Sequence, residues 1–284
     1  FSKAKKINSL LKRFPVLIEG DDKAANFYKK MLAFMFSYVS HRVSEICDEI
    51  YEIDSAMCAG FGWQLGPFEI WDAIGIEKGI SLMKSENLDI PKWIQDTTIK
   101  SFYSIENNLS TFYSKSQQKY DQIPRLNKVI ILKNLKSNSL LWQNQGVSLI
   151  DLGDEVLNIE FHTKLNSIGK DVIEGINKGI ELGEEKFKGI VIGNQGEHFS
   201  AGADISMIFT LIVEQEWKLL EEAVRTFQNT SMKIRYSSVP IVVASHGLTL
   251  GGGCEFSLHA DAIQAAAETY IGLVELGVGL IPGG

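Results

Sequence analysis

A triplet of glycines shortly after an apolar run constrains this chain more than any other feature of its sequence. The run 241–244 predicts a buried strand, and Gly251, Gly252 and Gly253 then open a helix. Glycines at such a turn let backbone amides approach a ligand without a Cβ in the way, and the start of a helix directs unpaired N–H groups and a positive dipole at it. We therefore expect an anion or oxyanion site at this turn.

A second glycine turn is expected beside the first. The run His198-Phe-Ser-Ala-Gly-Ala-Asp204 follows a predicted buried strand, and strands alternate with helices over 147–266. This alternation predicts α/β layers around a largely parallel sheet, in which turns after neighbouring strands meet at one edge. Two amides can then converge on one oxygen. The nucleotide patterns GxxxxGK[ST] and GxGxxG are absent from the sequence, which argues against nucleotide sites.

The expected elements of this second half are short. They are strands over 147–152, 156–161, 189–192 and 239–244, helices over 168–182, over 217–234 and after Gly251, and a strand or helix edge over 262–266. Glu255 lies in the first turn of the glycine-started helix. A carboxylate is favoured there electrostatically, so its plainest interpretation is structural.

The first 110 residues are predicted to be all-helical. Apolar side chains recur at spacings of four, three and four, which predicts the apolar face of a helix that runs from Asp22 toward Glu49. These side chains are Phe27, Met31, Phe34 and Tyr38. Asp54 is expected to cap a second helix that ends at Gly60, followed by helices over 68–73, 76–83 and 93–102. Trp63 and Trp71 are expected in the core. The polar stretch 104–121 is interpreted as a surface helix or a linker.

The composition limits the function classes. The chain has 284 residues, is 45% hydrophobic and carries a formal charge of −7, which leaves no basic surface for nucleic acid. No apolar run reaches the roughly 20 residues that span a bilayer. Three cysteines without metal spacing favour a reducing, cytoplasmic location. No metal site is expected, because no acid or cysteine stands at ligand spacing from His41, His162, His198 or His259.

The second half resembles the enoyl-CoA hydratase/isomerase, or crotonase, family. The resemblance covers about 148–284 and rests on Phe199-Ser-Ala-Gly-Ala-Asp-Ile205, His246-Gly247, Gly251-Gly-Gly-Cys-Glu255, Asp261, Glu275 and Ile281-Pro-Gly-Gly284. It implies a crotonase-like ββα spiral domain over 146–284, incomplete at its C-terminus, that handles acyl-CoA thioesters. The expected reaction is the addition of water to trans-2-enoyl-CoA. Double-bond isomerisation and a non-catalytic acyl-CoA-binding or assembly role stay open as alternatives.

The resemblance also implies a role for individual residues. The amides of Ala203 and Gly252 would form the oxyanion hole, Glu255 would activate the water, and Glu275 would protonate the α-carbon. Substrate contacts are expected from the first turn and from an early loop, at Ala201, Gly202, Asp204, Ile205 and Lys164. The stretch 161–166 lacks the proline after arginine that is usual in the family.

The first half resembles the helical C-terminal domain of 3-hydroxyacyl-CoA dehydrogenases. The matching residues are Arg42, Ile53-Asp-Ser-Ala-Met57, Gly60-Phe-Gly-Trp63 and Gly66-Pro-Phe-Glu-Ile-Trp-Asp72, with His41 where the family usually has asparagine. We assign 1–125 to this domain and a linker. The order of the two domains is similar to that of bacterial multidomain fatty-acid oxidation enzymes. It implies that the chain is part of a longer polypeptide that forms homo-oligomers. The NAD site and the dehydrogenase activity are then expected outside this chain, and no cofactor is expected for the chain itself.

Overall fold

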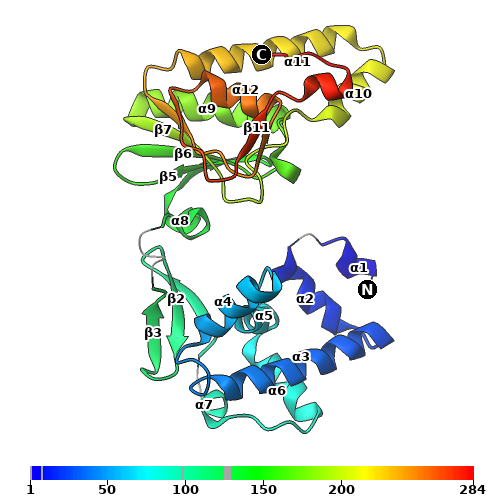
Figure 1. Ribbon diagram of the computed structural model, residues 1–284, viewed down its shortest axis with the longest axis vertical. Coiled ribbons are helices and arrows are strands. Elements are labelled where there is room, and N and C mark those ends of the chain that lie inside the picture. Colours follow the sequence, from blue (N-terminus) through cyan, green and yellow to red (C-terminus); the bar gives the residue numbers. More distant parts are fainter. Residues whose placement is uncertain (1, 8, 97–98, 125–128) are drawn as a thin grey trace. The chain divides into compact units, whose positions relative to one another are not determined.

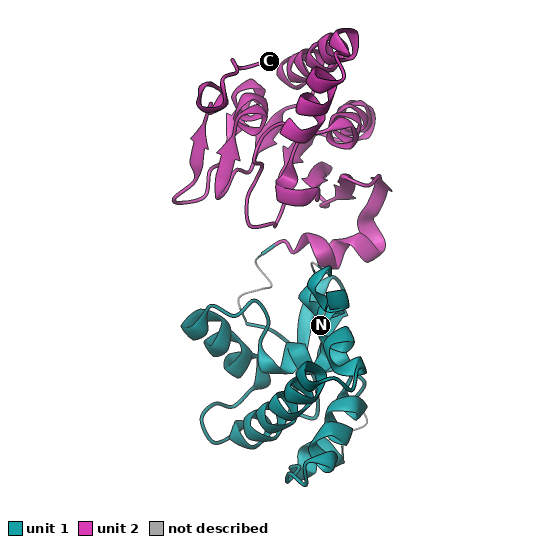
Figure 2. Cartoon of the chain, turned by 90° about the vertical axis from the view of Figure 1, so that its right-hand side faces the viewer, with its two compact units in different colours: residues 1–129 teal, residues 130–284 magenta. Residues whose placement is uncertain are grey.

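The computed structural model describes residues 2–7, 9–96, 99–124 and 129–284. They form two compact units, residues 1–129 and 130–284 (Figure 2). Residues 126–145 lie between the two domains expected from the sequence. The described part of this stretch forms α8 (Leu132–Ser139) and β4 (Leu140–Gln143), which belong to the second unit. The first expected domain ends at residue 125, which, like 126–128, lies outside the described residues.

Unit 1 combines seven described helices with a small sheet (Figure 1). The helices are α1 (Ser2–Lys5), α2 (Leu10–Glu19), α3 (Lys23–Arg42), α4 (Ile50–Phe61), α5 (Pro67–Ile74), α6 (Ile76–Ser85) and α7 (Lys92–Gln95). Several begin at strong start signals. The Asp22 carboxylate accepts the amide of Ala25 at 2.8 Å at the start of α3, and the Glu69 carboxylate accepts the amide of Gly66 at 2.8 Å at the start of α5.

Helix α3 carries the predicted apolar face, but that face is exposed. Its four side chains are between 38% and 65% exposed, while the buried face includes Leu32, Ala33, Phe36 and Val39. The helix also ends at Arg42, well before Glu49, because the backbone of Val43 leaves the helical region with ψ of 128° and Ser44 follows with a left-handed φ of 72°. Trp71 lies in the core as predicted, whereas Trp63 does not and is 37% exposed.

The predicted surface helix or linker over 104–121 is wrong, and the helical part predicted to reach residue 110 ends at α7. The segment forms an antiparallel sheet of β1 (Tyr103–Glu106), β2 (Leu109–Ser114) and β3 (Lys119–Gln122). Asn107 and Asn108 both have positive φ, as a two-residue hairpin turn requires. The helix predicted over 93–102 is reduced to α7, and residues 97–98 lie outside the described part of the chain.

Asp54 caps a helix, but not the one in which it lies. It sits inside α4, whose start is capped by Glu49, and its carboxylate accepts the amides of Phe68 and Glu69 at 2.9 and 3.0 Å at the start of α5. The Tyr103 hydroxyl donates to it at 2.9 Å. A Cβ on Gly66 would lie 2.2 Å from the Asp54 side chain, so only glycine permits this approach.

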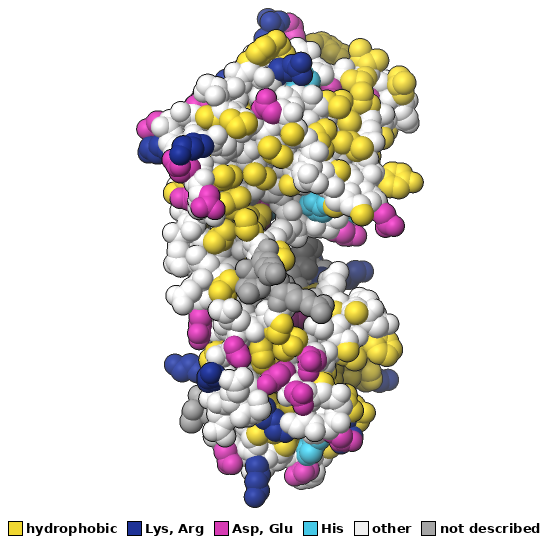
Figure 3. Space-filling view, turned by 60° about the vertical axis from the view of Figure 1, so that its left-hand side comes forward, with side chains coloured by type: hydrophobic (Ala, Val, Ile, Leu, Met, Phe, Trp, Pro, Cys, Tyr) yellow, Lys and Arg dark blue, Asp and Glu magenta, His cyan; other side chains and the backbone are white. Residues whose placement is uncertain are grey.

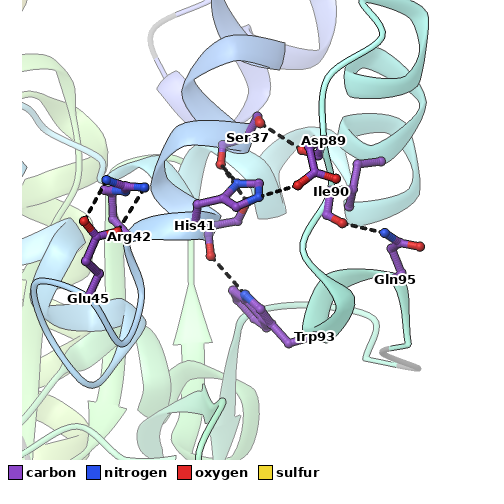
Figure 4. A network of polar contacts seen from close by, with 9 residues as sticks. Ser37, His41, Arg42, Glu45, Asp89, Ile90, Trp93 and Gln95 are labelled. Carbon is purple, nitrogen blue, oxygen red and sulfur yellow. Dashed lines mark hydrogen bonds and ion pairs between the residues drawn. The ribbon is translucent and has the colours of Figure 1, made fainter.

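A polar network joins the end of α3 to the segment after α6 (Figure 4). The His41 ring contacts the Ser37 carbonyl oxygen at 2.7 Å through Nδ1 and the Asp89 carboxylate at 3.0 Å through Nε2. The indole N–H of Trp93 donates to the Ser40 carbonyl oxygen at 3.0 Å. The histidine that departs from the family pattern therefore has a structural role here.

Unit 2 is built on a six-stranded sheet of order β10-β8-β7-β6-β5-β4. Its further strands are β5 (Val147–Asp151), β6 (Val156–Phe161), β7 (Gly189–Ile192), β8 (Ile241–Val243) and β10 (Ala262–Ile263). Strands β6, β7, β8 and β10 run parallel, and β4 and β5 are antiparallel. A separate parallel pair joins β9 (Leu248–Leu250) to β11 (Tyr270–Gly272). The predicted α/β layering is confirmed.

Besides α8, the described helices of unit 2 are α9 (Lys170–Lys186), α10 (Ile205–Val213), α11 (Trp217–Arg235) and α12 (Gly252–His259), with short 3-10 turns at η2 (Lys164–Asn166) and η3 (Glu275–Val278). Helix α9 lies against the sheet and α11 lies against α9 (Figure 1), with the Asn177 amide donating to the Thr230 hydroxyl at 2.9 Å. The core between the sheet and α9 is mainly aliphatic and includes Val147, Ile159, Ile176 and Ile192.

Several large apolar side chains of unit 2 remain exposed. Hydrophobic side chains gather on the face of this unit that Figure 3 shows. Helix α10 has no buried residue, and Phe209 and Val213 are among its exposed side chains. Within the described residues, no helix is both long and apolar enough to cross a membrane.

Candidate active site

The first glycine turn lies against the start of α12. Gly202 has a φ of +94°, and a Cβ placed on it would meet the Leu250 carbonyl oxygen at 2.8 Å and the Gly252 amide nitrogen at 3.4 Å. Both the backbone angle and the close approach require glycine at this position. The two turns that follow β7 and β8 in the sequence are therefore adjacent in the fold.

Backbone pairing fixes the direction of the first turn. The Ile168 amide donates to the Gly202 carbonyl oxygen at 2.8 Å, and the Asp204 amide donates to the Ile168 carbonyl oxygen at 3.0 Å. In this parallel bridge the backbone N–H and C=O groups of Ala203 itself point away from Ile168. Over the described residues, neither the Ala203 amide nor the Gly252 amide has a hydrogen-bond acceptor. Two free donors thus belong to adjoining turns.

Glu255 is buried in the first turn of α12 and is 5% exposed. Its Oε1 accepts the backbone amide of Gly284 at 2.7 Å. Burial raises the pKa of this carboxyl group above 4.5, with a further contribution from the negative charge of Glu275, while the Gly284 amide lowers it. A carboxylate with a raised pKa is a better proton acceptor than an ordinary surface glutamate.

Glu275 reaches the same glycine triplet from a different element. It begins η3, directly after the small β9–β11 pair, and its Oε1 lies 3.1 Å from the position that a Cβ on Gly251 would take. Its Oε2 is shielded from solvent and has no hydrogen-bond partner among the described residues. The site therefore holds two carboxylates from separate elements beside two free amides.

The other predicted contact residues surround the first turn. The Ala201 amide donates to the Leu165 carbonyl oxygen at 3.1 Å, which places η2 and Lys164 next to the turn. Lys164 is exposed. Asp204 caps α10, since its carboxylate accepts the amides of Ser206 and Met207 at 3.1 and 3.4 Å, and Ile205 is half exposed on the first turn of that helix.

The sequence reasoning missed the residues that hold the first turn in place. Ser200 and Asn166 are buried polar side chains whose hydrogen bonds go to backbone groups of the two loops. A polar residue directly beside a glycine turn at the end of a buried strand is the only signal the sequence offers for them. No group of three potential metal ligands occurs in the part of the chain that the structure describes.

Two family models match this chain. Residues 27–126 match the 3-hydroxyacyl-CoA dehydrogenase C-terminal domain, and residues 151–284 match enoyl-CoA hydratase/isomerase. A solved structure of an enoyl-CoA hydratase from Bacillus anthracis is 27% identical and superposes with a TM-score of 0.45 over 49% of this chain and 54% of that one.

Curated relatives extend the match over nearly the whole chain. A Bacillus subtilis protein named "Probable 3-hydroxyacyl-CoA dehydrogenase" is 43% identical over 99% of this chain. A Rickettsia prowazekii protein that bears the name of a fatty acid oxidation complex trifunctional enzyme is 30% identical over 94% of it. The matches cover 36% and 34% of those proteins, so this chain spans about a third of their length.

Proposed function

Because the chain consists of a 3-hydroxyacyl-CoA dehydrogenase C-terminal domain followed by a domain of the enoyl-CoA hydratase/isomerase family, we propose that its second unit adds water to trans-2-enoyl-CoA. The observation that carries the proposal is the pair of free amides, on Ala203 and Gly252, beside the carboxylates of Glu255 and Glu275. The product would be a 3-hydroxyacyl-CoA.

The two amides suit the charge that develops in this reaction. When water attacks C3 of the enoyl group, the electrons of the C2–C3 double bond move onto the thioester oxygen as an enolate. Preorganised N–H donors at that oxygen lower the barrier by about 3 kcal/mol each. The Ala203 and Gly252 amides can serve as these donors because no protein acceptor among the described residues occupies them.

The two carboxyl groups suit the proton transfers. Glu255, as a carboxylate with a raised pKa, would accept a proton from the attacking water. Glu275, in its protonated form, would then give a proton to C2, so that one proton is taken up and one released in each turnover. The Oε2 of Glu275 is free for this transfer, since no hydrogen bond within the described residues holds it.

The wider setting belongs to the same proposal. The name of the longer Rickettsia prowazekii relative favours a role in fatty-acid oxidation. We propose that NAD is bound by a part of the polypeptide outside this chain. We also propose that the parent is a homo-oligomer. A cytoplasmic location is proposed on the three free cysteines, Cys47, Cys58 and Cys254.

The test is hydration of crotonyl-CoA, followed by loss of the ultraviolet absorbance of the conjugated thioester. Glu255→Gln should lower kcat by about 10²- to 10⁴-fold, because the amide cannot accept the proton of the water. Glu268→Gln, an exposed glutamate of the same unit, is the matched control. Activity that is insensitive to Glu255→Gln, a shifted double bond as product, or binding of crotonyl-CoA without turnover would each contradict hydration by this site. The assay is run on this chain and on the full-length parent.

A further inference from the structure

A fully buried serine lies between the two turns of the candidate active site. The hydroxyl of Ser200 donates to the Asn166 carbonyl oxygen at 2.7 Å and accepts the Gly202 amide at 3.1 Å. One oxygen therefore satisfies a backbone group of η2 and a backbone group of the first glycine turn. The Gly202 amide immediately precedes the peptide that carries the Ala203 N–H.

The backbone of Ser200 is bonded to the second turn. Its amide donates to the Leu248 carbonyl oxygen at 3.0 Å, and its carbonyl oxygen accepts the Leu250 amide at 3.0 Å. Strand β9 leads from there directly into the glycine triplet. A Cβ placed on Gly253 would lie 2.7 Å from the Ser200 Cβ and 3.0 Å from its Oγ, so the side chain packs directly against the start of α12.

These contacts connect Ser200 to both free amides, although it touches neither. We propose that Ser200 is a positioning residue that sets the direction of the Ala203 amide relative to the Gly252 amide. The inference rests on the proposed function. Its physical basis is that without the hydroxyl both the Gly202 amide and the Asn166 carbonyl would lack a partner in a buried environment. The turn would then rotate to satisfy them, and the Ala203 N–H would leave its direction.

Asn166 holds the carbonyl group to which Ser200 donates. Its side-chain amide donates to the His198 carbonyl oxygen at 2.8 Å, and its backbone has a left-handed φ of 51°. The carbonyl that accepts from Ser200 is thus held by a residue that is itself anchored to the first turn. A fixed acceptor fixes the hydroxyl rotor of Ser200, and the oriented hydroxyl presents its lone pair to Gly202.

The experiment compares wild type with Ser200→Ala in the intact chain. The first readout is the infrared stretch of a ¹³C-labelled carbonyl in bound butyryl-CoA, a saturated thioester that cannot be hydrated. Polarisation by two amides lowers this frequency, and Ser200→Ala should lose at least half of the wild-type shift. The second readout is hydration of crotonyl-CoA. Its kcat should fall by about 10- to 100-fold with little change in KM, since misdirected donors act mainly on the transition state.

Ser257→Ala is the matched control. Ser257 is also fully buried, and its hydroxyl donates to the Gly253 carbonyl oxygen at 2.7 Å within α12. Its removal should leave the carbonyl shift and kcat unchanged. If Ser200→Ala does not fold, Ser200→Cys replaces it, because a thiol is a weak donor and acceptor and should reduce the carbonyl shift in the same sense.

The outcomes separate the two proposals. A wild-type protein that binds butyryl-CoA without any carbonyl shift overturns the oxyanion hole and with it the proposed function. A wild-type shift that persists unchanged in the folded Ser200 variant overturns the positioning role alone. The positioning role is also overturned if the unfolding midpoint of the Ser200 variant falls while its carbonyl shift and its kcat per folded molecule stay at wild-type values.

Discussion

The two units both bury carboxylates, and they differ in how those carboxylates are bonded. In unit 1, Asp54 accepts three donors, and Asp72 accepts the amides of Phe102 and Tyr103 at 2.7 and 2.8 Å. In unit 2, one backbone amide bonds to Glu255, and Oε2 of Glu275 has no partner within the described residues. Both oxygens of each carboxylate in the first pair accept a donor from the protein, and this is not so in the second pair.

This difference separates the proposed catalytic acids, Glu255 and Glu275, from Asp54 and Asp72, which a raised pKa alone does not do. Burial raises the pKa of Asp54 to about 7 and that of Asp72 to about 6, and it also raises the pKa of Glu255. A carboxylate whose two oxygens both accept backbone donors from another segment ties chain segments together. A carboxylate with unused lone pairs can bind water or a substrate proton.

The largest expected effect is on catalysis in unit 2. Glu275→Gln should lower kcat for crotonyl-CoA by about 10²- to 10⁴-fold, because the amide cannot give a proton to C2. The free energy of unfolding should stay within about 0.5 kcal/mol of wild type, since no described partner is lost at Oε2. Denaturant titration beside the kinetic assay checks both values. A large loss of stability with full activity would erase the distinction between the two pairs.

The opposite pattern is expected for Asp54→Ala. It leaves the amides of Phe68 and Glu69 and the Tyr103 hydroxyl without an acceptor, which should destabilise unit 1 by about 2–4 kcal/mol. Hydration by unit 2 should be unchanged below the transition. Denaturant titration followed by tryptophan fluorescence measures the loss. Asp89→Ala, which removes an exposed carboxylate of the same unit, should cost less than about 1 kcal/mol.

A smaller effect follows from pH. The folded pKa values of Asp54 and Asp72 lie above their ordinary value of 3.8, so the folded chain binds more protons than the unfolded chain between about pH 4 and 7. The free energy of unfolding should therefore decrease as the pH rises through this window, by about 1 kcal/mol or more between pH 5 and 8. Asp54→Asn cannot titrate and should reduce this slope. An identical slope in the variant would contradict the assignment to Asp54.

The smallest expected effect concerns Lys164. Lys164 is an exposed residue of η2, which is bonded to the first turn, so its ammonium can attract a phosphate of CoA. Lys164→Ala should raise KM for crotonyl-CoA about two- to fivefold at low salt, with kcat unchanged and the effect reduced at high salt. Lys218→Ala, an exposed lysine on α11, serves as the comparison. An equal change in both variants would show a general charge effect and no specific contact.

The sequence predicts best where burial is strongest. Strands β6 and β7 have the bounds predicted for them, because short runs of Val, Ile and Phe between turn residues have few other ways to fold. The positions of Ala203, Gly252 and Glu255 at adjoining turns follow from β7 and its neighbour β8. Their roles in hydration come from the family resemblance and stay predictions until the variants are measured.

The sequence predictions fail where polar residues form the strands or make the long-range hydrogen bonds. The strands β1 to β3 are mostly polar, and the Asn107-Asn108 pair signals a hairpin that a search for apolar periodicity overlooks. The exposed face of α3 shows that a regular apolar spacing does not reveal which side of a helix is buried. The side-chain hydrogen bonds of Asp54 to Phe68 and of Ser200 to Asn166 join segments that are separated in sequence, so a local pattern does not predict them.

The separate β9–β11 pair gives the two proposed catalytic acids different mechanical supports. Glu255 is carried by α12, whereas Glu275 follows β11, which the Gly251 amide holds through the Gly272 carbonyl oxygen at 3.0 Å. If β11 separates from β9, the proposed proton donor Glu275 leaves the site, whereas Glu255 remains on α12. The observed turnover is then the chemical rate multiplied by the fraction of molecules in which this small sheet is closed. Hydrogen exchange at the amides of β11 reports that fraction directly.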